Sequence, residues 1–283
     1  MTSPSVSIAT AVVEHYQRVS TYLTPPAIKA LHVPPLQGDR RNVFCVLELE
    51  DGTPGLAYVA LEKVHDRLGL DAQRYIQRGD APASVLAGLT HNDGVRRALG
   101  LAAANAYARW LYDRAGFVPP EDTTALAGFD VGAGERVGMV GLFVPLLDRV
   151  TSLGAELSVL ELNPELVGDF GSYRVSLDAA VLGECETVLC TSSVLLSGGF
   201  EQIRAACPKA QRFAVLGPGA GLLPEPLFAC GVDTLGGSWV INAAAVIDAV
   251  REGESWSRHV RKTVLRRGQC PNSLELARRL AQG

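Results

Sequence analysis

The chain has 283 residues, with 47% hydrophobic residues, 20% charged residues and a formal net charge of −4. This length allows one large domain or two modest ones, each with a buried core. The composition is that of an ordinary globular protein. It lacks the basic excess of a nucleic-acid-binding surface, so no nucleic-acid partner is predicted. The most basic run, residues 258–267, is interpreted as a solvated helix face.

The N-terminus lacks the basic start and apolar block of a signal peptide. No apolar run approaches the roughly 18 residues that a membrane-spanning helix needs. We therefore expect a cytoplasmic protein without a membrane partner. We also expect a homodimer, although no segment of the sequence indicates its interface.

The six cysteines are scattered and form no C-x-x-C pair. Several stand in apolar stretches such as "VFCVL", which favours buried free thiols over disulfides or a zinc site. The five histidines form no H-x-x-x-H motif. The sequence therefore predicts no metal site built from a local motif, and leaves open one assembled from distant residues.

The first part of the chain is predicted to be a small α+β domain over residues 1–118. Apolar residues at helical spacing indicate a helix over 6–23, and a proline-rich connector follows over 24–39. Two β-rich runs around a Gly/Pro turn indicate a hairpin over 42–64. Residues 91–116 predict a long helix that Asn92 or Asp93 caps. Residues 119–135, rich in glycine, proline and acids, are the predicted linker.

From residue 136 onward, short apolar runs alternate with helical stretches. The predicted strands are 136–142, 156–162, 186–192, 212–218 and 232–240. The predicted helices are 145–153, 200–207, a short one near Pro224, and 243–252. Continuous apolar strands separated by helices indicate a parallel sheet covered on both faces. Residues 136–283 are therefore predicted to form a Rossmann-like, doubly wound domain, and the fold class is α/β.

In such sheets, ligands bind beyond the C-terminal ends of the strands. After the first strand stand Gly141, Leu142 and Phe143, where a pyrophosphate would need several glycines. This loop disfavours NAD, FAD and ATP. A nucleoside-type cofactor without a pyrophosphate, such as S-adenosylmethionine, fits it better, and so does an unrelated ligand.

Several residues after the other strands are candidate ligand contacts. Glu161 stands 20 residues after Gly141, the offset of an acid that binds ribose, or it is an exposed acid that ends a strand. Asn163 precedes a proline and also suits a turn. The remaining candidates at strand ends are Thr191, Ser192, Ser193, Gly217, Pro218, Gly219, Ala220 and Trp239. The serines lack a nucleophile-elbow motif, so no catalytic residue is identified.

Two polar groups of the first part are further candidates. Asn105 interrupts an apolar helix face, and a buried amide must find partners, so it either joins the two domains or lines a cleft between them. Glu62 and His65 follow the hairpin as cleft candidates, with a solvated surface position favoured for His65.

Several motifs between about residues 90 and 255 resemble the putative heavy-metal chelation domain family. These are "LGLAAANA", "VGMVGLFVPLL", "VLELNPE", "LCTSSVLLSGGFEQI", "VLGPGAGLLPEPLFACGVDTLGGSWV" and "AVREGE". The resemblance implies an N-terminal domain like that of enolase, a Rossmann-like domain, and an active site at their interface. This chain has "CTSS" where the family usually has "TGTT", and Gly219 where the family commonly has serine.

Two functions compete on these grounds. The first is a small-molecule-binding protein whose ligand, a metal or metal chelate among the options, lies in the interdomain cleft. The second is an enzyme that uses S-adenosylmethionine or another nucleoside cofactor for group transfer or cyclisation. A missing acid or base does not exclude the second, because proximity alone can drive alkyl transfer. A non-catalytic interaction subunit ranks last, because small-residue loops beside a cleft favour a small ligand.

Overall fold

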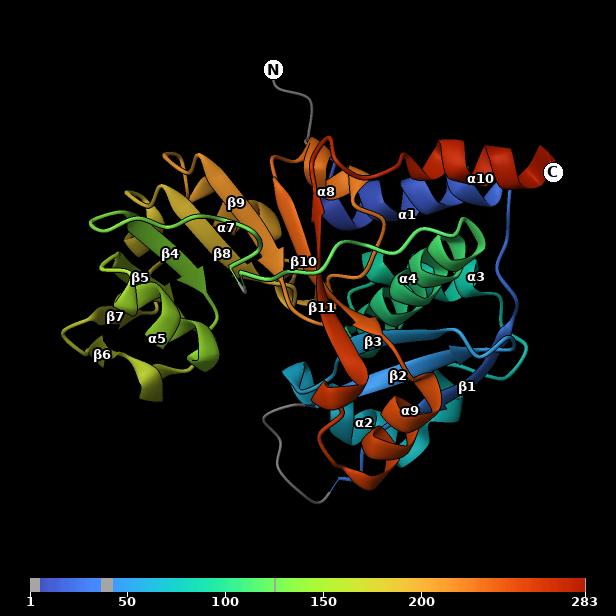
Figure 1. Ribbon diagram of the computed structural model, residues 1–283. Helices are drawn as coiled ribbons and strands as arrows, with labels where there is room; N and C mark the ends of the chain where they lie inside the picture. Colours follow the sequence, from blue (N-terminus) through green and yellow to red (C-terminus); the bar gives the residue numbers. More distant parts are fainter. Residues whose placement is uncertain (1–5, 37–42, 125, 283) are drawn as a thin grey trace.

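The computed structural model describes residues 6–36, 43–124 and 126–282. It contains a three-stranded antiparallel sheet and an eight-stranded, mostly parallel sheet, each covered by helices (Figure 1). This arrangement confirms the predicted α/β class. The likeness of the first part to the N-terminal part of enolase stays a prediction.

The first part of the chain combines the small sheet with helices. Its helices are α1 (Ile8–Ser20), α2 (Val64–Asp71), α3 (Pro82–Leu86) and α4 (Gly94–Arg114). Its strands are β1 (Ile28–His32), β2 (Phe44–Leu49) and β3 (Pro54–Tyr58). The Asp93 carboxylate caps α4 by accepting hydrogen bonds from the backbone N–H groups of Val95 and Arg96. The hairpin and the capped helix confirm the prediction, whereas β1 lies inside the segment that we interpreted as a connector.

The second part of the chain forms the large sheet. Its strands are β4 (Arg136–Val140), β5 (Glu156–Leu160), β6 (Gly168–Asp169), β7 (Tyr173–Ser176), β8 (Thr187–Thr191), β9 (Arg212–Leu216), β10 (Thr234–Val240) and β11 (Val260–Arg266). The spatial order is β11-β10-β9-β8-β4-β5-β7-β6. The strands from β10 to β7 run parallel, and β11 and β6 run antiparallel at the two edges. The parallel strands follow the Rossmann order, in which the winding direction reverses between β4 and β8.

Helices stand between several of these strands and after the last one. They are α5 (Val144–Ser152), α6 (Val194–Ser197), α7 (Phe200–Ala205), α8 (Glu225–Ala229), α9 (Ala243–Glu252) and α10 (Ser273–Gln282). Short 3-10 turns span Leu61–Lys63, Ala72–Arg74, Ala87–Thr90, Pro164–Leu166, Ala179–Leu182 and Ser257–His259. All four predicted helices of this part are present, whereas β6, β7 and α10 were not predicted. In the part of the chain that the structure describes, no helix is long and apolar enough to span a membrane.

The interpretation of the basic run 258–267 as a solvated helix face was wrong, because the run contains the whole of strand β11. Seven residues of β11 pair with β10, from Val260 opposite Val240 to Arg266 opposite Thr234. Thr263, Val264 and Leu265 of β11 are buried, and the charged residues Arg261, Lys262 and Arg266 flank them. Counting charges alone concealed a β-branched strand that gains its stability from the neighbouring strand.

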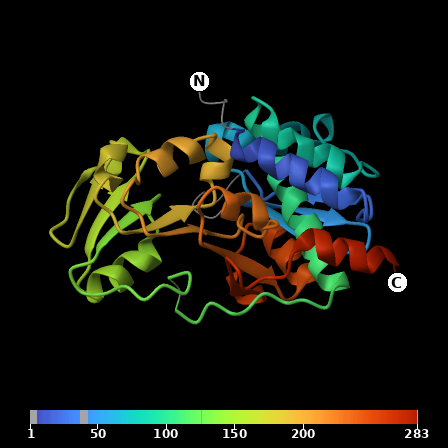
Figure 2. The same cartoon turned by 90° about the horizontal axis from the view of Figure 1, so that it is seen from above.

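The predicted linker packs against this strand. It runs as an extended segment from the end of α4 to the start of β4 (Figure 2). The backbone N–H of Asp122 donates to the carbonyl of Lys262 at 3.0 Å, and that of Val264 donates to the carbonyl of Pro120 at 2.8 Å. The segment therefore covers the outer edge of β11.

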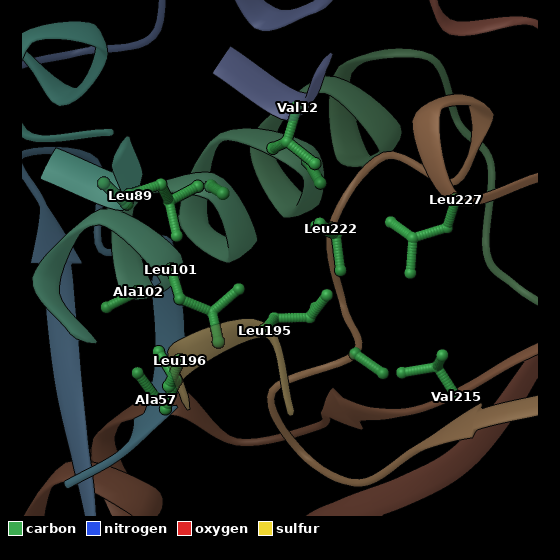
Figure 3. Close-up of a cluster of buried hydrophobic side chains, with 14 of the residues drawn as sticks. Val12, Ala57, Leu89, Leu101, Ala102, Leu195, Leu196, Val215, Leu222 and Leu227 are labelled. Carbon is green, nitrogen blue, oxygen red and sulfur yellow. The ribbon is translucent and has the colours of Figure 1, made fainter. Parts of the chain in front are cut away.

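The largest hydrophobic cluster contains side chains from both parts of the chain (Figure 3). The residues that meet there from the first part include Val12, Ala57, Leu89, Leu101 and Ala102. Those from the second part include Leu195, Leu196, Val215, Leu222 and Leu227. Because all of these side chains are buried, the two parts pack through an apolar contact that excludes water.

Candidate functional site

The ends of β4 and β8 touch at the point where the winding of the sheet reverses. Gly141 follows β4 with a φ of +81°, and a Cβ placed on it would lie 3.1 Å from the side chain of Thr191. Leu142 and Phe143 are half-buried and pack against the apolar cluster beneath α5. The loop that replaces a glycine-rich phosphate loop therefore contributes part of its apolar surface to the core.

Glu161 is bound to the backbone of its own domain. One carboxylate oxygen accepts from the Leu142 N–H at 2.8 Å. The other accepts from the N–H groups of Leu162 at 2.7 Å and Asn163 at 3.3 Å. Asn163 Oδ1 accepts in turn from the Glu165 N–H at 3.0 Å. Glu161 thus fastens the loop after β4 to the end of β5, and its role toward a ribose stays a prediction.

The first part of the chain reaches these strand ends through β3. Burial, followed by the negative charge of Glu161, raises the pKa of the Tyr58 hydroxyl. Beyond Tyr58, Glu62 forms an ion pair with Arg97 at 2.7 Å, and Arg97 Nε donates to the Leu196 carbonyl at 2.5 Å. Glu62 is therefore engaged at the junction of the two parts.

His65 corrects a minor expectation, because it is buried rather than solvated. Its Nε2 lies 2.9 Å from the carbonyl of Pro34, at hydrogen-bond distance. The ring therefore supports the loop that follows β1, and it does not line the pocket described below.

Ser192, directly after β8, packs against the glycine loop 217–221. Thr191 Oγ1 and Ser193 Oγ lie 3.0 Å apart. The Ser192 N–H donates to the Leu216 carbonyl at 2.6 Å. A Cβ at Gly217 would lie 2.9 Å from Ser192 Oγ, and one at Gly219 would lie 3.0 Å from it. Glycine at these positions allows the buried serine and the loop to approach closely.

Asn105 holds the opposite side of the same loop. Its Nδ2 donates to the Leu56 carbonyl of β3 at 2.6 Å and to the Gly219 carbonyl at 3.1 Å. This confirms that the amide joins the two parts of the chain. Its Oδ1 is buried and has no hydrogen-bond partner among the described residues, and only 5% of the residue is exposed. Such an orphan acceptor costs about 1–3 kcal/mol unless water or a ligand satisfies it.

A pocket of about 520 Å³, which includes open solvent, lies beside this amide. We call it the Asn105 pocket. Its walls are α4, β3, loop 217–221, β10 and β11. Thr263 of β11 is opposite Gly237 of β10, where a Cβ would lie 3.1 Å from the Ala220 carbonyl oxygen, so glycine lets loop 217–221 approach the strand. The apolar part of its lining includes Leu56, Leu235 and Leu265.

Arg109 is the charged residue of the pocket lining. Its Nε donates to the Asp113 carboxylate and its Nη1 to the Val240 carbonyl, both at 2.7 Å. The guanidinium carbon lies 3.8 Å from the ring centroid of Trp239, a cation–π contact. These contacts hold the cation in one place at the pocket wall.

The structure divides the predicted site residues into two groups. One group lies at the strand ends and comprises Gly141, Leu142, Phe143, Glu161, Asn163, Thr191, Ser192, Ser193 and Gly217. The other lines the Asn105 pocket and comprises Asn105, Pro218, Ala220 and Trp239. Gly219 stands between them, touching Ser192 on one side and Asn105 on the other.

Sequence reasoning missed Arg109 and Thr263 as pocket residues. Arg109 follows Asn105 by four residues, so the helical period places both on one face of α4. That spacing is a signal that the sequence contains. Thr263 was missed because its strand was interpreted as a helix.

Metal-binding side chains do not gather in the part of the chain that the structure describes. No group of three or more His, Cys, Asp or Glu residues there could hold a metal ion. The six cysteines are free, as predicted, and four of them are buried. Burial raises the pKa of Cys45 to about 12 and that of Cys207 to about 12, so these thiols stay protonated. The described residues therefore present no side-chain cluster that fits a resident heavy metal.

Comparisons with known proteins support the fold and the family. Two solved structures of DUF364-family proteins of unknown function are similar to this chain. The protein from Pyrococcus horikoshii is 21% identical with a TM-score of 0.66, and the match covers 92% of this chain and 99% of the Pyrococcus chain. The protein from Desulfitobacterium hafniense is also 21% identical with a TM-score of 0.66, and covers 90% of this chain and 98% of its own. At this identity the likeness shows the fold alone.

A search of curated proteins found no match. A family described as putative heavy-metal chelation, DUF364, matches residues 124–267, which is half of the chain. This chain therefore belongs to the DUF364, or putative heavy-metal chelation, family.

Proposed function

We propose that this protein binds a small organic molecule in the Asn105 pocket, between its N-terminal α+β domain and its Rossmann-like domain. The observation that carries the proposal is Asn105 Oδ1, a buried acceptor without a partner among the described residues, on a side chain that lines the pocket. Buried polar groups are almost always satisfied, and either a water or a ligand can be the partner of this oxygen. A ligand donor at this oxygen supplies the missing hydrogen bond.

The pocket has the composition of a small-molecule site. Such sites are mostly apolar, with a few placed polar groups, and they occur between domains. Here Leu56, Leu235 and Leu265 supply apolar surface. The polar side chains of the lining are Asn105, Arg109, Tyr112, Ser238 and Thr263. The family description points to metals, but the described residues offer no donor cluster for one. We therefore assign the pocket to an organic molecule.

The alternative is an enzyme that uses S-adenosylmethionine at the strand ends. The contact between Gly141 and Thr191 at the winding reversal favours it, because Rossmann-type sheets bind ligands there. Glu161 counts against it, since both of its carboxylate oxygens already accept backbone hydrogen bonds. It ranks second for this reason.

A thermal-shift screen with two matched variants tests the proposal. The panel contains hydroxy acids, amino acids, sugars, S-adenosylmethionine, NAD and divalent metal ions. A ligand at about 100 times its Kd adds about 2.7 kcal/mol to the free energy of unfolding. Thr263→Phe places a bulky ring in the pocket lining and should abolish the shift. Lys262→Phe is the control, because Lys262 is exposed and does not line the pocket.

The outcomes separate the two functions. A stabilising compound that loses its effect in Thr263→Phe and keeps it in Lys262→Phe supports the pocket. Stabilisation by S-adenosylmethionine that persists in Thr263→Phe but disappears in Glu161→Ala favours the strand ends instead. Stabilisation by metal ions alone would refute an organic ligand.

A further inference from the structure

We infer that the ligand of the Asn105 pocket is a small hydroxycarboxylate, with its carboxylate at Arg109 and its hydroxyl donating to Asn105 Oδ1. The inference rests on the proposed function and specifies the ligand class of the same site. It follows from the hydrogen-bond donors and acceptors that Asn105 and Arg109 have left unused.

Asn105 can only accept a hydrogen bond from a ligand. The amide orientation is determined, because the Nδ2 group faces two carbonyl oxygens, those of Leu56 and Gly219. Both amide hydrogens are thereby used, and Oδ1 keeps its lone pairs. The ligand group that meets Oδ1 must carry a hydrogen, as a hydroxyl does. A metal cation is a poor alternative there, since the oxygen is uncharged and the nearest charged lining group is a guanidinium.

Arg109 selects the charge of the ligand. It is the one residue of the described pocket lining that is charged at neutral pH. Tyr112, also in the lining, stays neutral because burial raises its pKa well above the usual range. Nε and Nη1 are engaged by Asp113 and Val240, and Nη2 makes no hydrogen bond to the described residues. A planar guanidinium with free donors in a fixed place suits a carboxylate.

The spacing of the two groups suits a short molecule. Asn105 and Arg109 are four residues apart, so they face the same side of α4 about 6 Å apart along its axis. The hydroxyl and carboxylate of one compact hydroxy acid can span such a separation. Leu235 and Leu265 lie on the opposite wall, where they contact the carbon skeleton.

Matched pairs of probes test the inference without altering the structural hydrogen bonds of Asn105. Isothermal titration of the full chain would compare malate with succinate and lactate with propionate, since each pair differs only in the hydroxyl. We expect the hydroxy acid of at least one pair to bind at least tenfold more tightly. Arg109→Gln should weaken its binding about tenfold or more, whereas Arg114→Gln, on the same helix but outside the pocket lining, should not.

The inference is overturned if both members of each pair bind equally, because Oδ1 would then play no part. It is also overturned if no hydroxy acid binds at millimolar concentration, or if Arg109→Gln, folded by circular dichroism, binds as tightly as the wild type. These failures leave the proposed function intact when another panel compound stabilises the protein and loses its effect in Thr263→Phe. If no hydroxy acid binds and no panel compound loses its effect in Thr263→Phe, the pocket is refuted as a ligand site.

Discussion

Glu161→Gln separates a structural role of this acid from a ligand-binding role. The carboxylate accepts three backbone hydrogen bonds, which join the loop after β4 to the end of β5. Glutamine has nearly the same shape but keeps one acceptor oxygen, and its NH₂ group would face a backbone N–H. If Glu161 holds the loop, the variant weakens the protein with no ligand present.

The expected loss follows from the number and exposure of these bonds. A hydrogen bond to a charged group contributes about 1.5–3 kcal/mol net. Glutamine loses at least one of the three bonds and weakens the others. Leu162 and Asn163 are exposed, so water replaces part of the loss at one oxygen. We expect the free energy of unfolding to fall by about 1–2 kcal/mol, or a few degrees in melting temperature.

Urea denaturation measures this change, and hydrogen exchange at the Leu142 amide locates it. Glu165→Gln is the matched control, because Glu165 is an exposed acid four residues away whose carboxylate makes no hydrogen bond to the described residues. The structural role is refuted if Glu161→Gln unfolds within about 0.3 kcal/mol of the wild type and leaves Leu142 exchange unchanged. A ribose-binding acid would give that result.

Three further predictions concern stability and reactivity. Burial lowers the pKa of His32, so stability is complete above about pH 6.5 and falls as the pH drops through the folded-state pKa. Urea midpoints for His32→Gln should vary less over that range, and an equal slope would contradict this. Gly55→Ala should cost about 3 kcal/mol or more, because its Cβ would collide with the backbone of α4, whereas Gly132→Ala, with open space, should stay within about 0.5 kcal/mol. A thiol reagent should label native protein at the two half-buried cysteines only, Cys230 and Cys270, and mass spectrometry showing a labelled buried cysteine would refute this.

The large sheet was predictable because its signals are local. Each of the predicted strands is a continuous apolar run, and such runs mark strands buried on both faces. The alternation with helices then indicated parallel pairing and right-handed connections. The start of α4 was also predictable, because Asp93 caps a helix through N–H groups only two and three residues away. Strands with weaker local signals were missed, including β1, β6 and β7.

The candidate site was only partly predictable, because local patterns do not show which distant residues meet. Gly141, Thr191 and Ser192 were predicted from the rule that ligands bind at strand ends, and their role toward a ligand stays a prediction. The contacts that the predicted residues make could not be predicted. Glu161 binds its own loop, and Ser192 supports the glycine loop. Residues 258–267 were not predicted as a strand because of their charges. Their buried residues are stabilised by pairing with β10, which no local pattern shows.

By itself, the sequence determined the fold class, the free thiols and the apolar loop that replaces a phosphate-binding turn, because each depends on residues near one another in the chain. Only the tertiary structure decided what Asn105 does. Its two hydrogen-bond partners lie 49 and 114 residues away, and they use both amide hydrogens. Packing leaves the remaining oxygen without a donor among the described residues, on a side chain that lines the same pocket as Arg109. No local pattern encodes that combination, because it depends on where four distant segments of the chain meet.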